Sequence, residues 1–354
     1  MAYFLNQFIA DSYFISSSLT SFSFFIGNLN PFTFSFGQKP TEFISRTNQI
    51  GKIIHTFDME NPSNKVYMVA GVRGSGKTVS LAEIADHYSS NDQWIVLRLS
   101  ADTDLIAGAV SELTRVSQFH DLDLGLNLNL GIAELSVNKT NDSLEKEAML
   151  RNILEKLKNK GKKVLFIIDE INRGEISKIL GELFFSMDPG YRGKSGEVAT
   201  QYSNMHTDPN EKFYIPENVY IIGTMNDIDR SVDSFDFAMR RRFRFVEVRA
   251  EDTQDMLESL EDEELKTEAI ARMDKLNAEI IRVADLNENY QIGASYFLKL
   301  KVLGFDDLWT DYLQPLLQDY VRGLNDEEEC MRRFAKAYGY TASGEGDSDE
   351  AAIN

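Results

Sequence analysis

The feature that most constrains this chain is the sequence GVRGSGKT at residues 71–78, which fits the pattern G-x-x-x-x-G-K-[ST] in full. It follows the short apolar run 66–70 and precedes a stretch with helical periodicity. A strand, a glycine-rich turn and a helix in this order predict a phosphate-binding loop, because glycines let the backbone curl around phosphates and the first N–H groups of the helix face the anion. Lys77 is expected to reach the β- and γ-phosphates, and Thr78 to bind Mg²⁺. The residues expected to contact the nucleotide are Gly71, Val72, Arg73, Gly74, Ser75, Gly76, Lys77, Thr78 and Val79.

A strand that ends in two acids is the second informative feature. The run VLFII at 164–168 is apolar throughout and is followed by Asp169 and Glu170. Such runs are typical of parallel strands covered by helices on both faces, and ligands bind at the carboxyl ends of these strands. We expect Asp169 to hold Mg²⁺ through water and Glu170 to polarise the attacking water. The alternative is that the two acids only cap the next helix.

A third strand and an arginine cluster complete the candidate site. The run VYIIGTMN at 219–226 ends in Asn226, whose amide can position the attacking water against the γ-phosphate. The sequence AMRRRF at 238–243 then brings Arg241 and Arg242 to a helix end. An arginine there can reach a neighbouring subunit's γ-phosphate as a finger in trans. The alternative is a set of cations that complements the helix C-terminus.

The order of the motifs GVRGSGKT, FIIDE, TMN and AMRRRF resembles the core of AAA+ ATPases, in which the residue matching Asn226 is called sensor 1. Over residues 169–300 the chain resembles the McrB-like branch, the motor subunits of modification-dependent restriction systems. The residues that carry this resemblance are DEINR at 169–173, TMNDIDRS at 224–231 and IGASYF at 292–297. It implies an α/β fold: a P-loop AAA+ core with a central parallel sheet flanked by helices, and a small C-terminal α-helical lid.

The chain departs from the McrB-like pattern in two ways. Asp227 stands where the branch has Thr, and residues 28–168 instead resemble a bacterial or archaeal STAND-like P-loop ATPase. The two resemblances together indicate a hybrid joined near the strand at 164–169. McrB-like motors use GTP, whereas the N-terminal half resembles ATP binders. Because purine recognition usually involves residues before the phosphate loop, ATP is favoured over GTP.

Composition narrows the partners and the compartment. The chain has 37 basic and 56 acidic residues, a net charge of −19, which argues against a chain-wide nucleic-acid-binding surface but leaves DNA open as a local partner. A single cysteine, Cys330, cannot form an internal disulfide, which favours a reducing, cytoplasmic location. Residues 1–27 contain no Lys or Arg, and their serines interrupt any long apolar run. They predict neither a secretory signal nor a membrane span.

The chain divides by pattern into four expected regions. They are a poorly specified N-terminal extension at 1–38, the P-loop AAA+ nucleotide-binding core at 39–250, the helical lid at 251–340 and a disordered acidic tail at 341–354. Within the core, 124–132 predicts a half-exposed strand or hairpin, and 176–184 predicts an amphipathic helix. The long polar segment 188–218 is a candidate partner-contacting element.

The expected function is that of an AAA+ nucleoside triphosphatase that binds and hydrolyses ATP, or GTP, with Mg²⁺. It would act as a subunit of a homo-oligomeric motor ring in a DNA restriction-type system. The sequence has no nuclease motif, so DNA cleavage would need a separate nuclease or effector subunit. One alternative is a STAND-like signalling or assembly switch with little turnover, and another is an inactive hybrid that binds nucleotide without hydrolysing it.

Overall fold

A computed structural model describes residues 49–101, 105–119, 142–173, 186–198, 212–226, 228 and 240–341. These residues form two compact units. The first ends at Arg249, and the second begins at Ala250.

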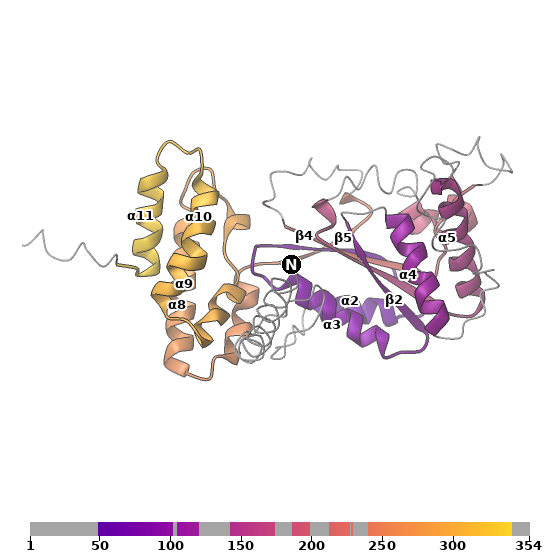
Figure 1. Cartoon of the computed structure of the whole chain (residues 1–354), viewed down its shortest axis with the longest axis horizontal. Helices are drawn as coiled ribbons and strands as arrows, with labels where there is room; N and C mark the ends of the chain where they lie inside the picture. The colour runs from indigo at the N-terminus through magenta and orange to yellow at the C-terminus, as the bar shows by residue number, and fades with distance from the viewer. Residues whose placement is uncertain are drawn as a thin grey trace, which may run out of the picture. The chain divides into compact units, whose positions relative to one another are not determined.

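The first unit is built on a parallel sheet of five strands (Figure 1). These strands are β1 (Val66–Gly71), β2 (Trp94–Ser100), β3 (Lys163–Asp169), β4 (Val219–Asn226) and β5 (Arg244–Val248). They lie in the order β2-β3-β4-β1-β5, and every neighbouring pair is parallel. The carboxyl ends of all the strands therefore meet at one edge of the sheet, which confirms the predicted parallel α/β core.

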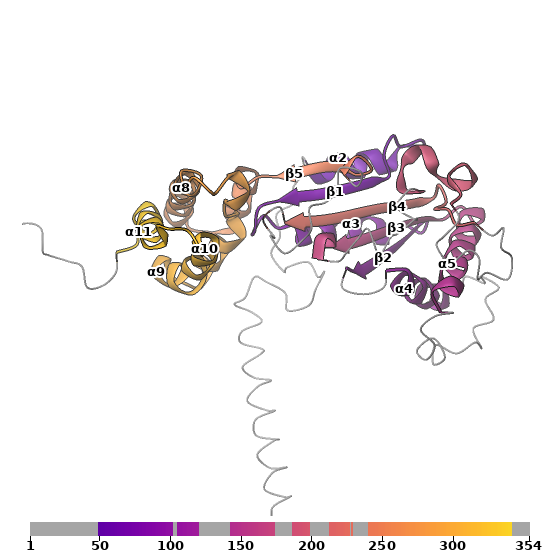
Figure 2. The same cartoon turned by 90° about the horizontal axis from the view of Figure 1, so that it is seen from above.

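Helices cover both faces of this sheet (Figure 2). The helices α2 (Gln49–Asp58) and α3 (Lys77–Ser89) pack against strand side chains on one face of the sheet, including Tyr67, Leu165 and Ile222. The helices α4 (Leu105–Phe119) and α5 (Asp142–Asn159) pack against strand side chains on the opposite face, such as Met68 and Phe166. Because side chains alternate along a strand, a run that is apolar at every position fills both of these cores.

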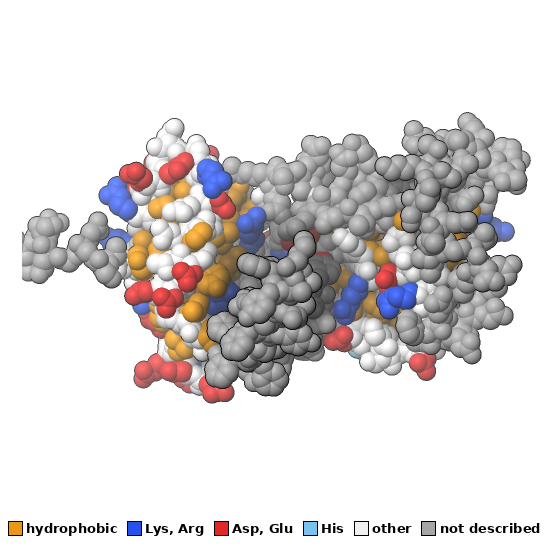
Figure 3. Space-filling view, in the orientation of Figure 1, with side chains coloured by type: hydrophobic (Ala, Val, Ile, Leu, Met, Phe, Trp, Pro, Cys, Tyr) orange, Lys and Arg blue, Asp and Glu red, His pale blue; other side chains and the backbone are white. Residues whose placement is uncertain are grey.

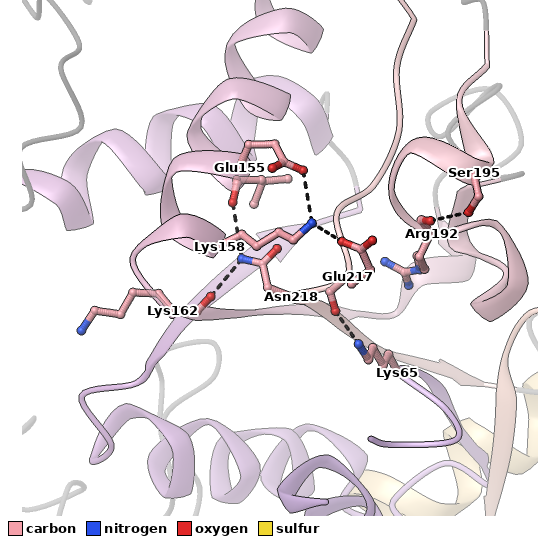
Figure 4. A network of polar contacts seen from close by, with 9 residues as sticks. Lys65, Glu155, Lys158, Lys162, Arg192, Ser195, Glu217 and Asn218 are labelled. Atoms are coloured by element: carbon pink, nitrogen blue, oxygen red, sulfur yellow. Dashed lines mark hydrogen bonds and ion pairs between the residues drawn. The ribbon is translucent and has the colours of Figure 1, made fainter. Parts of the chain in front are cut away.

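A network of polar contacts joins the segment before β4 to the amino-terminal edge of the sheet (Figure 4). Lys158 pairs with Glu217, and the Asn218 amide donates to the carbonyl of Lys162 at 2.9 Å. The guanidinium of Arg192 is buried and donates to backbone carbonyls, and desolvation lowers its pKa to about 10. The short 3₁₀ turns η4 (Pro189–Tyr191) and η5 (Gly193–Gly196) flank Arg192.

Two backbone hydrogen bonds, both 2.9 Å, join Val198 and Phe213 as an isolated antiparallel bridge. The bridge closes the two arms of the predicted partner-contacting element, and residues 199–211 between them lie outside the described part. The polar contacts of Arg192 and Glu217 attach these arms to the sheet.

All the regular elements described in the second unit are helices, joined by turns and irregular segments. The unit contains η7 (Glu251–Ser259), α8 (Glu263–Ile280), η8 (Glu288–Tyr290), η9 (Ala294–Lys301), α9 (Phe305–Leu308), the π-helical turn η10 (Trp309–Leu313), α10 (Gln314–Val321) and α11 (Glu327–Tyr338). Asp262 caps α8 by accepting from the N–H groups of Glu264 and Leu265. Other acidic side chains are spread over the face of this unit seen in Figure 3.

Two buried polar side chains hold the segment that resembles the McrB-like IGxSYF element. The Asn277 amide donates to the carbonyl of Ile292 at 2.9 Å and accepts from the N–H of Ile292 at 2.7 Å. The Thr253 hydroxyl accepts from the N–H of Ala294 at 2.8 Å. These side chains take the place of backbone hydrogen-bond partners, because the backbone groups of Ile292 and Ala294 that they bind lie outside a regular helix or strand ladder.

Several predictions lie outside the described residues. They concern the extension at 1–38, the hairpin at 124–132, the helix at 176–184, Asp227 and the tail beyond Thr341. Among the residues that the structure describes, no helix is both long enough and apolar enough to cross a membrane.

Candidate active site

The phosphate loop connects β1 to α3 as predicted from the sequence. Gly74 and Gly76 have φ angles of 74° and 71°, a backbone region that favours glycine. The N–H of Ser75 donates to the carbonyl of Val72 at 3.3 Å, which closes the turn. The helix α3 begins at Lys77 without a side-chain cap. Its first N–H groups therefore suit an anion rather than a protein side chain.

Lys77 is buried beneath this loop. Its ammonium nitrogen lies 2.9 Å from the carbonyl oxygens of Gly71 and Val72, and 3.4 Å from the hydroxyl of Ser75. A buried ammonium held by carbonyls at the mouth of a helix N-terminus adds a full positive charge to the helix dipole. The arrangement fits a polyphosphate group.

Thr78 and Asp169, the two predicted Mg²⁺ ligands, are in direct contact. The Thr78 hydroxyl donates to Asp169 Oδ2 at 2.8 Å, although the two residues are 91 positions apart. Asp169 is only 8% exposed. One hydroxyl and one carboxylate fit Mg²⁺, which is usually held by one or two carboxylates together with substrate phosphates.

Glu170 and Asn226 are also brought together. The Asn226 side-chain amide donates to Glu170 Oε1 at 3.2 Å, across neighbouring strand ends. Glu170 is the only non-glycine residue with a positive φ among those described, at 48°. This left-handed conformation costs about 1–2 kcal/mol for a residue with a side chain. Observed strain of this kind clusters at active sites, where the surroundings hold it in place.

Two further polar residues lie in this cluster and were not among the predicted site residues. Thr224 is fully buried, accepts a 2.8 Å hydrogen bond from the N–H of Glu170, and donates to Asp169 Oδ1. Asn172 is 3% exposed and donates to the carbonyl of Asn226 at 3.2 Å. The sequence signal for Thr224 would have been the register of β3 and β4. In that register Thr224 lies one residue beyond the Ile168–Gly223 pair, which places it beside Asp169.

The arginine cluster differs from the expectation in its burial. Arg241 is exposed, whereas Arg242 is 7% exposed and belongs to the interior of its unit. Arg240 is exposed and lies over the ring of Phe245, 5.9 Å from its centroid.

The five parallel strands, the phosphate loop and the acids at the end of β3 define a P-loop nucleoside triphosphatase. Two family patterns match the sequence: "AAA domain (dynein-related subfamily)" over residues 67–243, which is half of the chain, and "McrB, alpha-helical lid domain" over residues 268–328. The chain belongs to the AAA family of ATPases and is of the McrB-like type. The AAA match runs without a break through Asp169, so it gives no support to a change of family at that point.

Two curated proteins are similar over part of their length. The first is the Type IV methyl-directed restriction enzyme EcoKMcrB subunit of Escherichia coli (strain K12), 38% identical over 194 residues, which are 49% of this chain and 40% of that protein. The second is the Type II restriction enzyme BsuMI component YdiS of Bacillus subtilis (strain 168). It is 30% identical over 99 residues, which are 26% of this chain and 29% of that protein. The chain thus spans less than half the length of these relatives.

Solved structures with a similar course of the chain include Cdc6p from Pyrobaculum aerophilum, with a TM-score of 0.38 and 14% identity, covering 87% of this chain and 84% of that one. Another is the ORC1 protein of Aeropyrum pernix, with a TM-score of 0.37 and 12% identity, covering 84% and 78%. At these TM-scores the likeness adds nothing to the fold described above.

Proposed function

We propose that this chain hydrolyses ATP with Mg²⁺ as a motor subunit of a homo-oligomeric ring in a restriction-type system. The observation that carries the hydrolytic step is the contact between Asn226 and Glu170, 3.2 Å apart, next to the Thr78–Asp169 pair. A nucleotide-binding module without turnover needs the loop and the metal ligands, but not a carboxylate held by an amide beside them. The similar proteins named as restriction-enzyme components support the cellular setting.

Each side chain in the cluster has a role in this reaction. Lys77 and the N–H groups at the start of α3 bind the phosphates. Thr78 and Asp169 would hold Mg²⁺, which neutralises the charge that develops on the phosphates. Glu170 accepts a proton from the attacking water, and Asn226 keeps the Glu170 carboxylate and that water in line with the γ-phosphate. Arg241 supplies a positive charge to the site of a neighbouring subunit.

ATP is proposed over GTP because the part of the chain that precedes the phosphate loop does not resemble McrB-like GTP users. A turnover assay with ATP and GTP in parallel, with and without DNA, tests this choice. A preference for GTP would contradict it, and stimulation by DNA would support the restriction-type setting. DNA cleavage itself is assigned to a separate nuclease or effector subunit.

Replacing Glu170 by Gln tests the hydrolytic step. Glutamine keeps the length and the acceptor oxygen for Asn226 but cannot take a proton, so turnover should fall on the order of 10²-fold or more while nucleotide still binds. Phosphate release under saturating nucleotide gives the rate, and a fluorescent nucleotide gives the affinity. Glu60→Gln, an exposed position, is the control and should behave like the parent. Turnover of Glu170→Gln near the parent rate would remove Glu170 from the mechanism.

A further inference from the structure

The hydroxyl of Thr224 sits between the two acids at the end of β3. It accepts from the backbone N–H of Glu170 at 2.8 Å and donates to Asp169 Oδ1, while Asp169 Oδ2 accepts from Thr78 at 2.8 Å. A single oxygen atom therefore contacts both the side chain of Asp169 and the backbone of Glu170. The Thr224 side chain has no exposed surface, so water cannot replace either contact.

The backbone at Glu170 needs such a contact. Its φ of 48° is unfavourable for a residue with a Cβ and persists only where the surroundings hold it. The Glu170 carboxylate is held by Asn226, but its N–H is held by Thr224. If the peptide before Glu170 were released, the carboxylate would move with it, away from the position where Asn226 holds it.

We propose that Thr224 is the positioning residue of this site: its hydroxyl sets the orientation of Asp169 for Mg²⁺ and of Glu170 for the attacking water. The inference rests on the proposed hydrolysis and adds a residue to it. Thr224 does not touch nucleotide in this role, because its one donor proton is bonded to Asp169 and its side chain has no exposed surface.

The test compares Thr224→Val with Thr224→Ser. Valine keeps the shape but removes both hydrogen bonds, so kcat should fall on the order of 10²-fold, with nucleotide affinity at saturating Mg²⁺ close to that of the parent. Serine keeps the hydroxyl but loses a buried methyl group, so its kcat should stay near that of the parent even if its Tm is lower than that of the valine variant. A purely structural role predicts the reverse, with the serine variant no more active than the valine variant, and that order would overturn the proposal.

A second readout does not depend on turnover. The Mg²⁺ concentration needed for half-maximal binding of a fluorescent ATP analogue should rise on the order of 10-fold in Thr224→Val and remain unchanged in Thr224→Ser, because loss of a group that orients a metal ligand weakens metal binding by about 10–100-fold. If the parent and Glu170→Gln are equally inactive, the proposed hydrolysis fails, while this binding readout still decides the role of Thr224. If nucleotide binding by the parent, Thr224→Val and Thr224→Ser depends equally on the Mg²⁺ concentration, that role is overturned.

Thr253→Val is the matched control. Thr253 is also fully buried, and its hydroxyl also accepts a backbone N–H at 2.8 Å and donates to a carbonyl, but it lies in the helical unit. We expect a lower Tm and a retained kcat for this variant. A loss of kcat equal to that of Thr224→Val would show that any buried threonine hydroxyl gives the effect, and would overturn the inference.

Discussion

The ammonium group of Lys77 is held by two carbonyls and a hydroxyl of its own loop, at 2.9, 2.9 and 3.4 Å. These contacts fix the charge beside the first turn of α3, so the lysine side chain loses little further freedom when a triphosphate binds. If the loop holds phosphates as proposed, Lys77 adds a full positive charge to the neutral hydrogen-bond donors of the loop, and hydrogen bonds from a charged donor are about twice as strong as neutral ones.

Lys77→Ala should therefore weaken nucleotide binding by about 10–100-fold, the range expected when a charged hydrogen-bond donor is removed. Fluorescence titration with a labelled nucleotide measures this change, and circular dichroism verifies that the variant is folded. Lys275→Ala, at an exposed position of α8, is the control and should bind like the parent. An unchanged affinity for Lys77→Ala would show that the loop does not hold the phosphates.

The single residues of this site differ in how far the sequence predicts them. Lys77, Thr78, Asp169, Glu170 and Asn226 each stand at a fixed place in a motif, and the sequence paired them with a chemical role. Thr224 was not assigned a role, because its value comes from standing beside Asp169 on the next strand, 55 positions away. The burial of Arg242 was equally hidden, since three consecutive arginines look alike until the chain folds around one of them.

At the level of elements, the carboxyl ends of β1, β3 and β4 bring the site together. Gly71 pairs with Asn226 in register, and β5 lies on the other side of β1. A Cβ atom built on Gly71 would lie 2.3 Å from the carbonyl oxygen of Val248, so β5 can approach the start of the phosphate loop only because residue 71 is glycine. Apolar runs and terminal polar residues predict parallel strands, but not which strands are neighbours, because that order depends on contacts between distant segments.

Two identical substitutions should have opposite effects on these elements. Gly71→Ala should lower the free energy of unfolding by about 1–3 kcal/mol, as overpacking does, and weaken nucleotide binding by displacing the loop from β5. In Gly51→Ala, the new methyl group meets nothing within 4 Å and lies inside α2, so it should raise stability by about 0.5–1 kcal/mol. Thermal denaturation with and without nucleotide measures both effects. A Gly71→Ala protein with parental Tm and affinity would contradict the close approach of β5.

At the scale of the whole molecule, the net charge of −19 coexists with a compact group of arginines after residue 239. A chain so acidic gains solubility, but like charges on neighbouring copies would repel one another at most surfaces. An interface between copies is therefore most favourable where basic residues of one meet phosphates or acids of the next. Exposed Arg241 meets this requirement better than Arg240, whose side chain lies over the Phe245 ring, and better than buried Arg242, which would have to leave the interior of its own unit to reach a neighbour.

Mixing two inactive variants tests the ring and selects the arginine. If Arg241 is a trans finger, Arg241→Ala should bind nucleotide normally but lose about 10³–10⁵ in rate, because it removes charge only from a neighbour's transition state. Mixed with Glu170→Gln, it should recover activity at those interfaces where an intact Glu170 site faces an intact Arg241. Arg240→Ala is the neighbouring control. Because the Arg240 side chain lies over the Phe245 ring, this variant should keep its activity, whereas Arg242→Ala should mainly lower the Tm. The recovered rate should rise with total protein concentration and peak near equal amounts of the two variants. If no mixture regains activity although both proteins bind nucleotide, Arg241 does not act between subunits, and the proposed ring motor loses its main support from the sequence.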